Sequence, residues 1–577
     1  MNTIAEFLAA VLCQSLVAAS CFAAQSAPEG HGPLRVHPSN PRYLTDDGNR
    51  AIYLTGLHTW LDFQDGGVDY PPAPLDYNAY LDLLERHHHN FIRLWAWESA
   101  AWVRPDSSKL WLEPLPFART GPGVAADGRP KFDLNKLNPA YFERLRNRVA
   151  AANDRNFYVG VMLFQGFSVS RKSRSRRETP WAYHPLHHAN NINGINGDAD
   201  GDGEGYEIHQ LGNDRVTAIQ ETLVRKVVDI LNEFDNVVFE IGNECHGAST
   251  AWQYHMLQLI HAHEKEMPKR HLTWMTYQWD GIAGRGTDND LWRSPATLVS
   301  PSAGKDRAYE HAPPVADGTK IVIADTDHIN PRDRDRVAWI WKCFTRGLHP
   351  IFMDNPPVPG CPAHPDFTNG PHKPSERTRS AMGVTRTIAE TIDLANMTPT
   401  DDRSICSSGY CLTSPGREYV VWHDQQGLVR LMLPAGTFNA RWIDPVVGDE
   451  LAAERLTLRV RSSRQFKPPG NGPSVLHVKS LTKPQAKARR RVPVRLEMAA
   501  NRLLSNRHDE ITRIASNSGL SSSQNVTVHG DGPDFRGEVR ENGTVPLAPP
   551  KGTGPCFRLA RRKVTKHQPA EKWTSPP

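Results

Sequence analysis

The sequence predicts an α/β protein of the (β/α)8 barrel class, in which eight parallel strands alternate with helices and close on themselves. Two observations predict this fold. Strand and helix signals alternate over about 340 residues, and such alternation is typical of parallel α/β folds. Several strand signals also end in charged, amide or aromatic residues, as barrel strands do where they build an active site. A doubly wound open sheet is disfavoured because no glycine-rich phosphate-binding motif follows the first strand.

The predicted strands are short apolar runs rich in β-branched and aromatic residues, a pattern typical of strands covered on both faces. They cover residues 51–55, 91–94, 158–164, 237–241, 272–276, 297–300, 320–324 and 350–353. The predicted helices have apolar residues at helical spacing. They cover residues 77–87, 141–155, 215–232, 250–267, 336–345 and 377–396. Long loops follow the second and third strands, and we assign residues 35–400 to the barrel.

The sequence pattern changes near residue 404. Residues 418–422, 428–433 and 440–443 alternate apolar and polar side chains and are separated by turn-forming residues. This pattern predicts a small antiparallel β-sandwich over residues 404–478. Residues 479–577 are rich in Lys, Arg, Ser and Pro with little apolar periodicity, which predicts a disordered basic tail.

The first 24 residues are expected to form a signal peptide. They are apolar from Phe7 and end in small residues, although they contain no Lys or Arg. The expected location is therefore secreted or periplasmic. In an exported protein, Cys406 and Cys411 could close a small disulfide loop. No later apolar run approaches the ~20 residues needed to span a bilayer, so we expect no integral membrane association.

Composition excludes few partners but favours carbohydrate. Basic and acidic residues nearly balance, 68 against 63, so the whole-chain charge indicates no particular partner. The basic run 171–177 lacks interleaved aromatic residues, and we interpret it as a solvated loop and expect no nucleic-acid partner. The fifteen tryptophans include indole faces suited to stacking on sugars, although tryptophan is also ordinary core material.

The fourth predicted strand ends in Gly242-Asn243-Glu244 and anchors the candidate site. In a barrel, the C-terminal ends of all strands meet at one mouth. The candidate catalytic residues at this mouth are Glu244, Asp325 and Asp327. The candidate substrate-binding residues are His58, Trp60, Arg93, Trp95, Trp97, Gln165, Asn243, Gln278, His328 and Asp354. Paired carboxylates can cleave a glycosidic bond, because one protonates the leaving oxygen while the other attacks the anomeric carbon or activates water. Arg93 could keep the carboxylate of the seventh strand ionised.

Three short motifs, His58-Thr-Trp60, Arg93-Leu-Trp95 and Gly242-Asn-Glu244, resemble the clan A glycoside hydrolases. The resemblance implies a barrel whose acid/base glutamate follows an asparagine at strand four, here Glu244, and whose nucleophile ends strand seven. The stretch 442–448 resembles the collagen-binding-like β-sandwich domain that follows such barrels in secreted bacterial proteins. Together these resemblances cover roughly residues 35–478 and imply a secreted hydrolase of poly- or oligosaccharides.

The seventh strand departs from the family pattern because it carries no glutamate. Asp325 stands where the resemblance places the nucleophile. Asp327, two residues later, is expected to point to the same side of the chain as Asp325. Aspartate is shorter by one methylene, about 1.5 Å along the chain. Retaining enzymes need carboxyl groups about 5–5.5 Å apart and inverting enzymes about 6.5–9.5 Å, so the partner of Glu244 and the stereochemical outcome stay open. The alternative function is a non-catalytic carbohydrate- or matrix-binding protein on a degenerate barrel.

The stretch 198–205 resembles the start of a calcium-binding loop. Asp198, Asp200 and Asp202 alternate, and glycine stands at the sixth position. The twelfth position is His209 in place of the usual bidentate glutamate, so a solvated acidic loop is the alternative. We expect no required cofactor, and structural Ca²⁺ at this loop is the one metal that the sequence suggests.

Overall fold

A computed structural model describes residues 32–104, 106–170, 178–329, 336–361, 376–424 and 427–482 of the chain. The predicted signal peptide (1–24), the basic run 171–177 and residues 483–577 of the predicted tail lie outside the described residues.

Eight parallel strands close into a barrel, which confirms the predicted fold class. In barrel order they are β3 (Gly56–His58), β5 (Phe91–Leu94), β10 (Tyr158–Gln165), β11 (Val237–Asn243), β12 (Leu272–Thr276), β13 (Leu298–Ser300), β14 (Ile321–Asp325) and β15 (His349–Met353). All but β10 and β12, whose first residues are half-buried, are buried along their whole length, as expected of strands with the core on one side and helices on the other.

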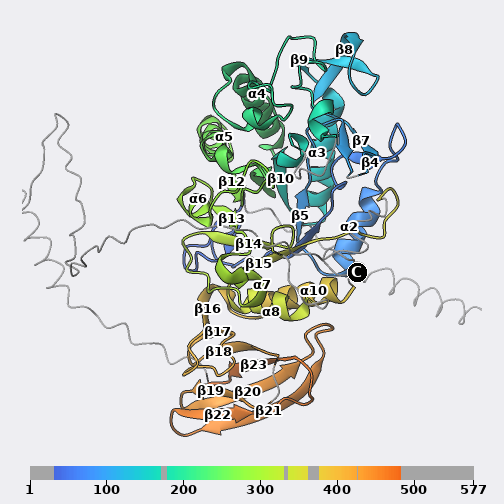
Figure 1. Cartoon of the computed structure of the whole chain (residues 1–577). Helices are drawn as coiled ribbons and strands as arrows, with labels where there is room; N and C mark the ends of the chain where they lie inside the picture. Colours follow the sequence, from blue (N-terminus) through green and yellow to red (C-terminus); the bar gives the residue numbers. More distant parts are fainter. Residues whose placement is uncertain are drawn as a thin grey trace, which may run out of the picture. The chain divides into compact units, whose positions relative to one another are not determined.

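Helices surround the barrel strands (Figure 1). They are α2 (Tyr77–Arg86), α3 (Pro139–Asp154), α4 (Asp214–Leu231), α5 (Thr250–His263), α6 (Asp288–Arg293), α7 (Ala308–His311), α8 (Val337–Thr345) and α10 (Glu376–Thr391). All six predicted helices are confirmed, whereas α6 and α7 are too short for their periodicity to be recognised in the sequence. The side chains of Asp76, Asn138 and Asn213 cap the first turns of α2, α3 and α4.

The first barrel strand lies later in the chain than predicted. Residues 51–55 lead into it, and Ile52 pairs instead with Leu44 beside the N-terminal hairpin of β1 (Arg35–Val36) and β2 (Leu44–Thr45). Strand β3 begins at Gly56, where a Cβ atom would lie 1.9 Å from the carbonyl oxygen of Phe91. Glycine therefore permits the close backbone approach that starts the β3–β5 pair. A search for apolar runs does not recognise this strand start, because glycine does not belong to such a run.

The loops after β5 and β10 are long, as predicted, and form a second hydrophobic core beyond the C-terminal strand ends. The loop after β5 contains β6 (Ala101–Val103), β7 (Lys109–Glu113) and a hairpin of β8 (Phe117–Val124) and β9 (Pro130–Leu137). Strand β4 (Asp65–Gly67), from the loop after β3, pairs with β7 and completes a three-stranded sheet with β6. Phe117, Phe132, Trp181 and Ile208 pack together in this second core.

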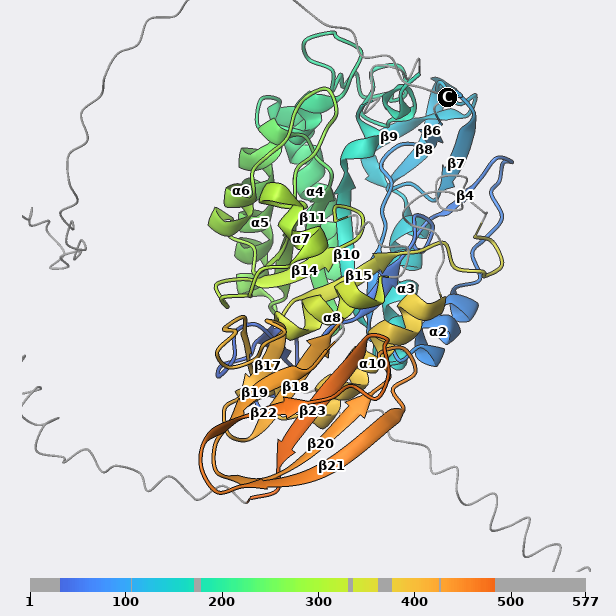
Figure 2. The same ribbon diagram turned by 60° about the horizontal axis from the view of Figure 1, so that its bottom comes forward.

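An antiparallel β region follows the barrel, as predicted (Figure 2). A six-stranded sheet runs in the order β16 (Thr398–Thr400), β17 (Cys411–Ser414), β18 (Glu418–His423), β23 (Ser474–Ser480), β20 (Gly436–Ile443) and β21 (Glu450–Leu458). A two-stranded sheet of β19 (Val429–Leu433) and β22 (Ser462–Phe466) completes it. Trp341 of α8 stacks on Trp422 of β18, with centroids 6.2 Å apart, and donates a hydrogen bond to the Pro445 carbonyl at 2.9 Å.

The predicted disulfide between Cys406 and Cys411 is not formed. Both residues are free cysteines in the sandwich core, and the Cys406 sulfur lies 3.5 Å from the Ser408 hydroxyl. Among the described residues, no helix combines the length and apolar character needed to cross a membrane.

Candidate active site

Arg93, the third residue of β5, connects three carboxyl or amide side chains inside the barrel. Its guanidinium donates to both oxygens of Glu240, at 2.8 and 2.6 Å, and to Asn243 Oδ1 at 2.7 Å. It also donates to Asp325 Oδ2 at 2.8 Å. Burial alone would lower the pKa of Arg93, but Glu240 and Asp325 outweigh burial and raise it. The second, fourth and seventh barrel strands are thus joined through one permanently charged group.

Asp325, at the end of β14, is fully buried with both oxygens occupied. Oδ1 accepts from His58 Nε2 at 2.9 Å and from the Asp327 backbone N–H at 3.0 Å, while Oδ2 accepts from Arg93. Burial alone would raise the pKa of Asp325, but His58 and Arg93 more than offset it and hold the pKa well below its usual range. Because an ionised carboxylate only accepts hydrogen bonds, His58 Nε2 is the donor of this bond. Asp325 is therefore held as a fixed anion.

Asp327 lies two residues further, close to Glu244. One ligand-type atom from each of Glu244, Asp327 and His328 lies within 4.8 Å of the other two. The Asp327 side chain is 10% exposed, and its Oδ2 lies 3.8 Å from Arg93 Nη1 and 3.7 Å from His328 Nε2. His328 Nε2 also donates to Asn243 Oδ1 at 3.1 Å. Burial lowers the pKa of His328, although Asp327 and Asp325 act in the opposite direction.

Glu244 follows β11 in a left-handed backbone conformation, with φ of 47°. Non-glycine residues rarely adopt this conformation, and it is common at functional sites that need a side chain aimed in one direction. Its backbone also touches the start of the loop after β10. A Cβ atom added at Gly166 would lie 2.0 Å from the Glu244 carbonyl oxygen. The position of Glu244 therefore depends on glycine at residue 166.

We expect Gly166→Ala to displace the Glu244 backbone and to lower kcat/KM on any hydrolysed glycan by about 10²-fold, the typical result of a ~1 Å misplacement. Gly212→Ala is the matched control, because nothing lies within 4 Å of a Cβ added there. Steady-state kinetics on both variants check this prediction, and equal activity of the two variants would contradict it.

Three buried residues behind this turn form an ion-pair network that sequence reasoning missed. Glu98 Oε1 lies 3.1 Å from His209 Nε2 and accepts from the Gln165 backbone N–H at 2.7 Å. Burial alone would raise the pKa of Glu98, but His209 and His184 lower it to about 2. Burial alone would lower the pKa of His209, but Cys245 and Glu98 raise it to about 10. The pair joins the loops that follow β5 and β10, and His209 also contacts Cys245, the residue after Glu244.

This pair predicts a pH-dependent contribution to stability. The lowered pKa of Glu98 makes its contribution complete above its ordinary value of 4.5 and lost as the pH falls through about 2. The raised pKa of His209 makes its contribution complete below 6.5 and lost as the pH rises through about 10. We expect Glu98→Gln to lower the free energy of unfolding by about 3–5 kcal/mol between these limits, because it leaves His209 buried without a counter-charge.

Denaturant melts of wild type and Glu98→Gln between pH 4 and pH 10 check this prediction, with the largest difference expected near pH 5–6. A difference between the two proteins that grows steadily toward pH 10 would contradict the assignment of charges.

Trp60 is the partly exposed member of an aromatic cluster at the mouth. It packs against Trp95, Trp97 and Trp102, with ring centroids 5.0–6.1 Å apart. Trp95 and Trp97 are only 1% and 2% exposed, and Trp97 Nε1 donates to the Trp60 carbonyl at 2.8 Å. His58 stacks on Trp95 with ring planes 4° apart. Of the three predicted sugar-binding tryptophans, Trp60 alone is half-buried, and the other two are buried and pack against it.

Three other predicted residues make structural hydrogen bonds. Gln165 lies beside Asn243 in the β10–β11 register, and its side chain accepts from the Phe167 N–H. Gln278 donates to Thr250 at the start of α5, at 2.7 Å. Asp354 is fully buried and accepts two hydrogen bonds from Arg379 of α10, at 2.7 and 3.0 Å. The structure therefore does not bring Gln278 or Asp354 into the hydrogen-bonded group around Arg93.

The acidic loop brings together two of the three predicted calcium ligands. Asp198 and Asp200 offer oxygens within 4.8 Å of each other and of Glu207, whereas Asp202 is not in this group. Asp202 instead accepts from the Glu204 backbone N–H at 2.7 Å. Burial and the three neighbouring aspartates raise the pKa of Glu207. Calcium binding at this loop stays a prediction, with Glu207 in the place predicted for Asp202.

Glu240 is the main site residue absent from the sequence prediction. It lies in the middle of β11, fully buried, and also accepts from the Thr276 hydroxyl at 2.7 Å. An acidic residue inside an otherwise apolar strand was the available signal, because a buried carboxylate needs a partner. Glu98 and His209 gave no such signal, since both lie in long loops whose paths the sequence does not specify.

Comparisons with known proteins agree with this architecture. A family model described as a domain of unknown function, DUF6298, matches residues 103–280, and a search of curated proteins finds no match. A crystal structure of a provisionally assigned glycoside hydrolase from Bacteroides vulgatus has 14% identity and a TM-score of 0.52, covering 79% of this chain and 84% of that chain. A family 5 glycoside hydrolase from the same organism has 14% identity and a TM-score of 0.50, covering 79% and 95%. At this identity the similarity shows the fold alone: the chain has a barrel like those of proteins named as glycoside hydrolases.

Proposed function

We propose that the protein hydrolyses O-glycosidic bonds of a poly- or oligosaccharide, with Glu244 as acid/base and Asp327 as its partner carboxylate. The observation that carries the proposal is the proximity of these two carboxylates, with oxygens within 4.8 Å, at the ends of β11 and β14. The motifs at the strand ends and the glycoside hydrolase barrels of similar fold support the same class of reaction.

Asp327 suits the reacting role better than Asp325. Each oxygen of Asp325 already accepts a hydrogen bond from His58, Arg93 or the backbone, and no part of the residue is exposed. Asp327 keeps some exposure, and its Oδ2 lies 3.8 Å from Arg93 Nη1. We assign Asp325 the role of a positioning residue, which holds Arg93 and the backbone turn that carries Asp327.

The short separation favours a retaining reaction, since retaining enzymes place their carboxyl groups about 5–5.5 Å apart. Asp327 would attack the anomeric carbon while Glu244 donates a proton to the leaving oxygen, and the C–O bond to the leaving group would break. Water would then attack the anomeric carbon and break its bond to Asp327, while Glu244 takes a proton from that water. Trp60 offers the indole face on which a sugar ring could stack, and His328 and Asn243 offer polar contacts beside it.

Export belongs to the same proposal. We expect the mature protein to begin near residue 24 or 25 and to be secreted or periplasmic, and we expect the sandwich to be of the collagen-binding-like type. N-terminal sequencing of the protein recovered from the medium or periplasm checks the cleavage. An intact N-terminus in the cytoplasmic fraction would contradict it.

A panel of poly- and oligosaccharides tests the activity, with the product anomer followed by proton NMR in the first minutes. We expect turnover of at least one glycan with retained configuration. Inverted product would contradict the role of Asp327 as nucleophile. Saturable binding without turnover on every glycan would instead support the alternative, a non-catalytic carbohydrate-binding protein.

A further inference from the structure

Three metal-ligating side chains converge at the mouth of the barrel. One ligand-type atom from each of Glu244, Asp327 and His328 lies within 4.8 Å of the other two, and Asp327 Oδ2 lies 3.7 Å from His328 Nε2. Bonds from zinc to oxygen or nitrogen are about 2.0–2.2 Å long, so ligand atoms around one zinc ion lie up to about 4.4 Å apart. The three side chains are therefore close to the spacing that a single ion requires.

These side chains are nearly shut off from water. Glu244 is 8% exposed, and the side chains of Asp327 and His328 are 10% and 3% exposed. Asp327 Oδ2 accepts no hydrogen bond from the described residues, and it lies 3.8 Å from Arg93 Nη1 and 3.7 Å from His328 Nε2. A metal ion contacts its ligands at shorter distances than the about 2.8 Å of a water oxygen. Ligands that exclude water from the space between them can therefore still enclose an ion.

The charges around the three side chains favour a cation. Arg93 donates hydrogen bonds to Glu240 and Asp325 at 2.6–2.8 Å, so its one positive charge is already matched by two carboxylates. Glu244 and Asp327 add two further carboxyl groups. A divalent cation between these two groups would offset both negative charges when both are ionised, and buried charges interact more strongly than charges in water.

The nitrogen ligand favours a transition metal ion over calcium. Imidazole suits zinc, copper and nickel ions, whereas calcium takes six to eight oxygen ligands. The other group of this kind, Asp198, Asp200 and Glu207 in the acidic loop, offers oxygens alone. The two groups therefore suit different ions, a transition metal at the mouth and calcium at the loop.

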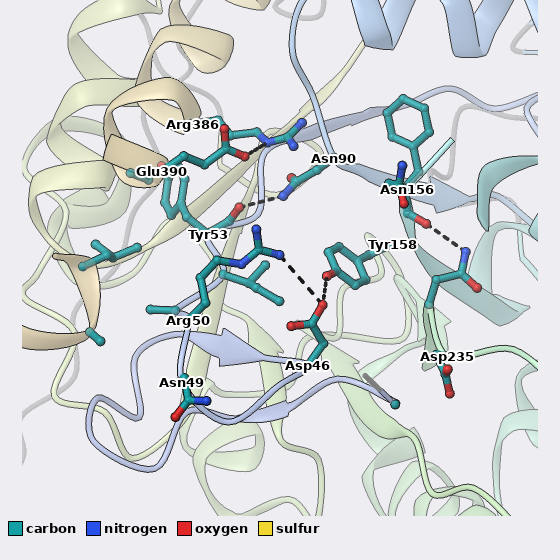
Figure 3. Close-up of a pocket in the computed structure, with 18 of the residues that line it drawn as sticks. Asp46, Asn49, Arg50, Tyr53, Asn90, Asn156, Tyr158, Asp235, Arg386 and Glu390 are labelled. Carbon is teal, nitrogen blue, oxygen red and sulfur yellow. Dashed lines mark hydrogen bonds and ion pairs between the residues drawn. The ribbon is translucent and has the colours of Figure 1, made fainter. Parts of the chain in front are cut away.

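A cavity of about 760 Å³ at the opposite end of the barrel contains no such group among the described residues. Its charged side chains contact one another or a hydroxyl group. Figure 3 shows Glu390 paired with Arg386, and Asp46 between Arg50 and Tyr158. We therefore place the transition metal at the mouth and not in this cavity.

We propose that Glu244, Asp327 and His328 form a binding site for a divalent transition metal ion, and that the bound ion blocks hydrolysis. Both carboxyl groups must be ionised to bind the metal, so Glu244 would have no proton for the leaving oxygen. The ion would also occupy the lone pair with which Asp327 attacks the anomeric carbon. The blocking rests on the proposed function, whereas the binding of the metal does not.

Equilibrium dialysis against Zn²⁺ tests the binding, with excess Ca²⁺ in the buffer to fill the acidic loop and with bound zinc measured by mass spectrometry. We expect the wild type to bind one zinc ion more tightly than any other. Asp327→Asn and His328→Gln each remove one ligand, and we expect each to weaken this binding at least about tenfold. His311→Gln, at an exposed position of α7, is the matched control and should bind zinc as the wild type does.

Kinetics test the blocking. We expect Zn²⁺ to inhibit hydrolysis in competition with the glycan, and EDTA to restore the rate. In His328→Gln, the zinc concentration that halves the metal-free rate of the same variant should rise at least about tenfold. In His311→Gln it should match the wild type.

Circular dichroism identifies the folded variants, and either folded ligand variant decides the test. No saturable zinc binding by the wild type, or undiminished binding in a folded ligand variant, would overturn the metal site. Zinc bound through these residues without inhibition would overturn the blocking. Zinc binding that depends on Asp327 and His328, in a protein that hydrolyses no glycan, would contradict the proposed function and support the metal site.

Discussion

Replacing Glu244 by glutamine is expected to lower kcat/KM on a natural glycan by about 10²–10⁴-fold, the usual contribution of a general acid–base group. The substitution keeps the shape of the side chain and the left-handed backbone at residue 244, but removes the proton that the leaving oxygen needs. Glycan affinity should persist, because Trp60 and the polar groups around Arg93 are unchanged.

An activated substrate provides the control for this prediction. In a nitrophenyl glycoside the leaving group departs without protonation. Glu244→Gln should therefore slow the first step on this substrate much less than it slows the first step on the natural glycan. Rates on the two substrates measure this difference. Undiminished hydrolysis of the natural glycan by Glu244→Gln would remove Glu244 from the mechanism.

Asparagine substitutions at Asp325 and Asp327 are expected to have different effects. Asp325→Asn breaks the buried pair with Arg93 and should cost about 3–5 kcal/mol of unfolding free energy. Asp327→Asn should leave stability nearly unchanged but lower kcat by about 10³-fold or more, since it removes the proposed nucleophile. Thermal melts and kinetics on the same preparations separate the two roles.

Asp325→Glu provides a matched control for charge. It restores the carboxylate but adds a methylene to a fully buried site, so it should be less stable than wild type. If Asp327→Asn keeps full activity while Asp325→Asn stays folded and inactive, the roles of the two aspartates are reversed.

The barrel could be predicted because its strands are local apolar runs and its helices have regular apolar spacing. Strands β5 and β12 match their predicted bounds residue for residue. Strand β3 does not, because Gly56 is selected by contact with Phe91, a residue far along the chain. Local pattern thus predicts elements, whereas close backbone approaches between elements require the structure.

The candidate site was predictable only in part, for the same reason. Glu244, Arg93 and Asn243 are recognisable because they end or lie in strands of one barrel. Asp325 and Asp327 are two residues apart and are expected to point to the same side of the chain, so the sequence could not decide which of them is the partner of Glu244. What separates them is burial and hydrogen bonding: Asp325 is enclosed by His58 and Arg93, while Asp327 is closer to solvent and to Glu244.

The network behind Glu244 and the opposite cavity depend on longer-range packing. His209 reaches Glu98 from a loop more than a hundred residues away, which no local pattern encodes. The cavity is likewise assembled from several α-to-β connections, the N-terminal hairpin region and α10. In both cases single residues look like ordinary loop positions, and their chemistry arises only where the loops meet.

The central claim, that Asp327 reacts with the anomeric carbon while Glu244 supplies the proton, is tested most directly by trapping the glycosyl intermediate. Incubation with a panel of 2-deoxy-2-fluoroglycosyl fluorides, followed by peptide mass spectrometry, identifies the residue that forms the bond. We predict one sugar adduct per chain on Asp327, absent in Asp327→Asn. An adduct on Asp325, or turnover of natural glycans with inverted product and no adduct, would contradict the assignment.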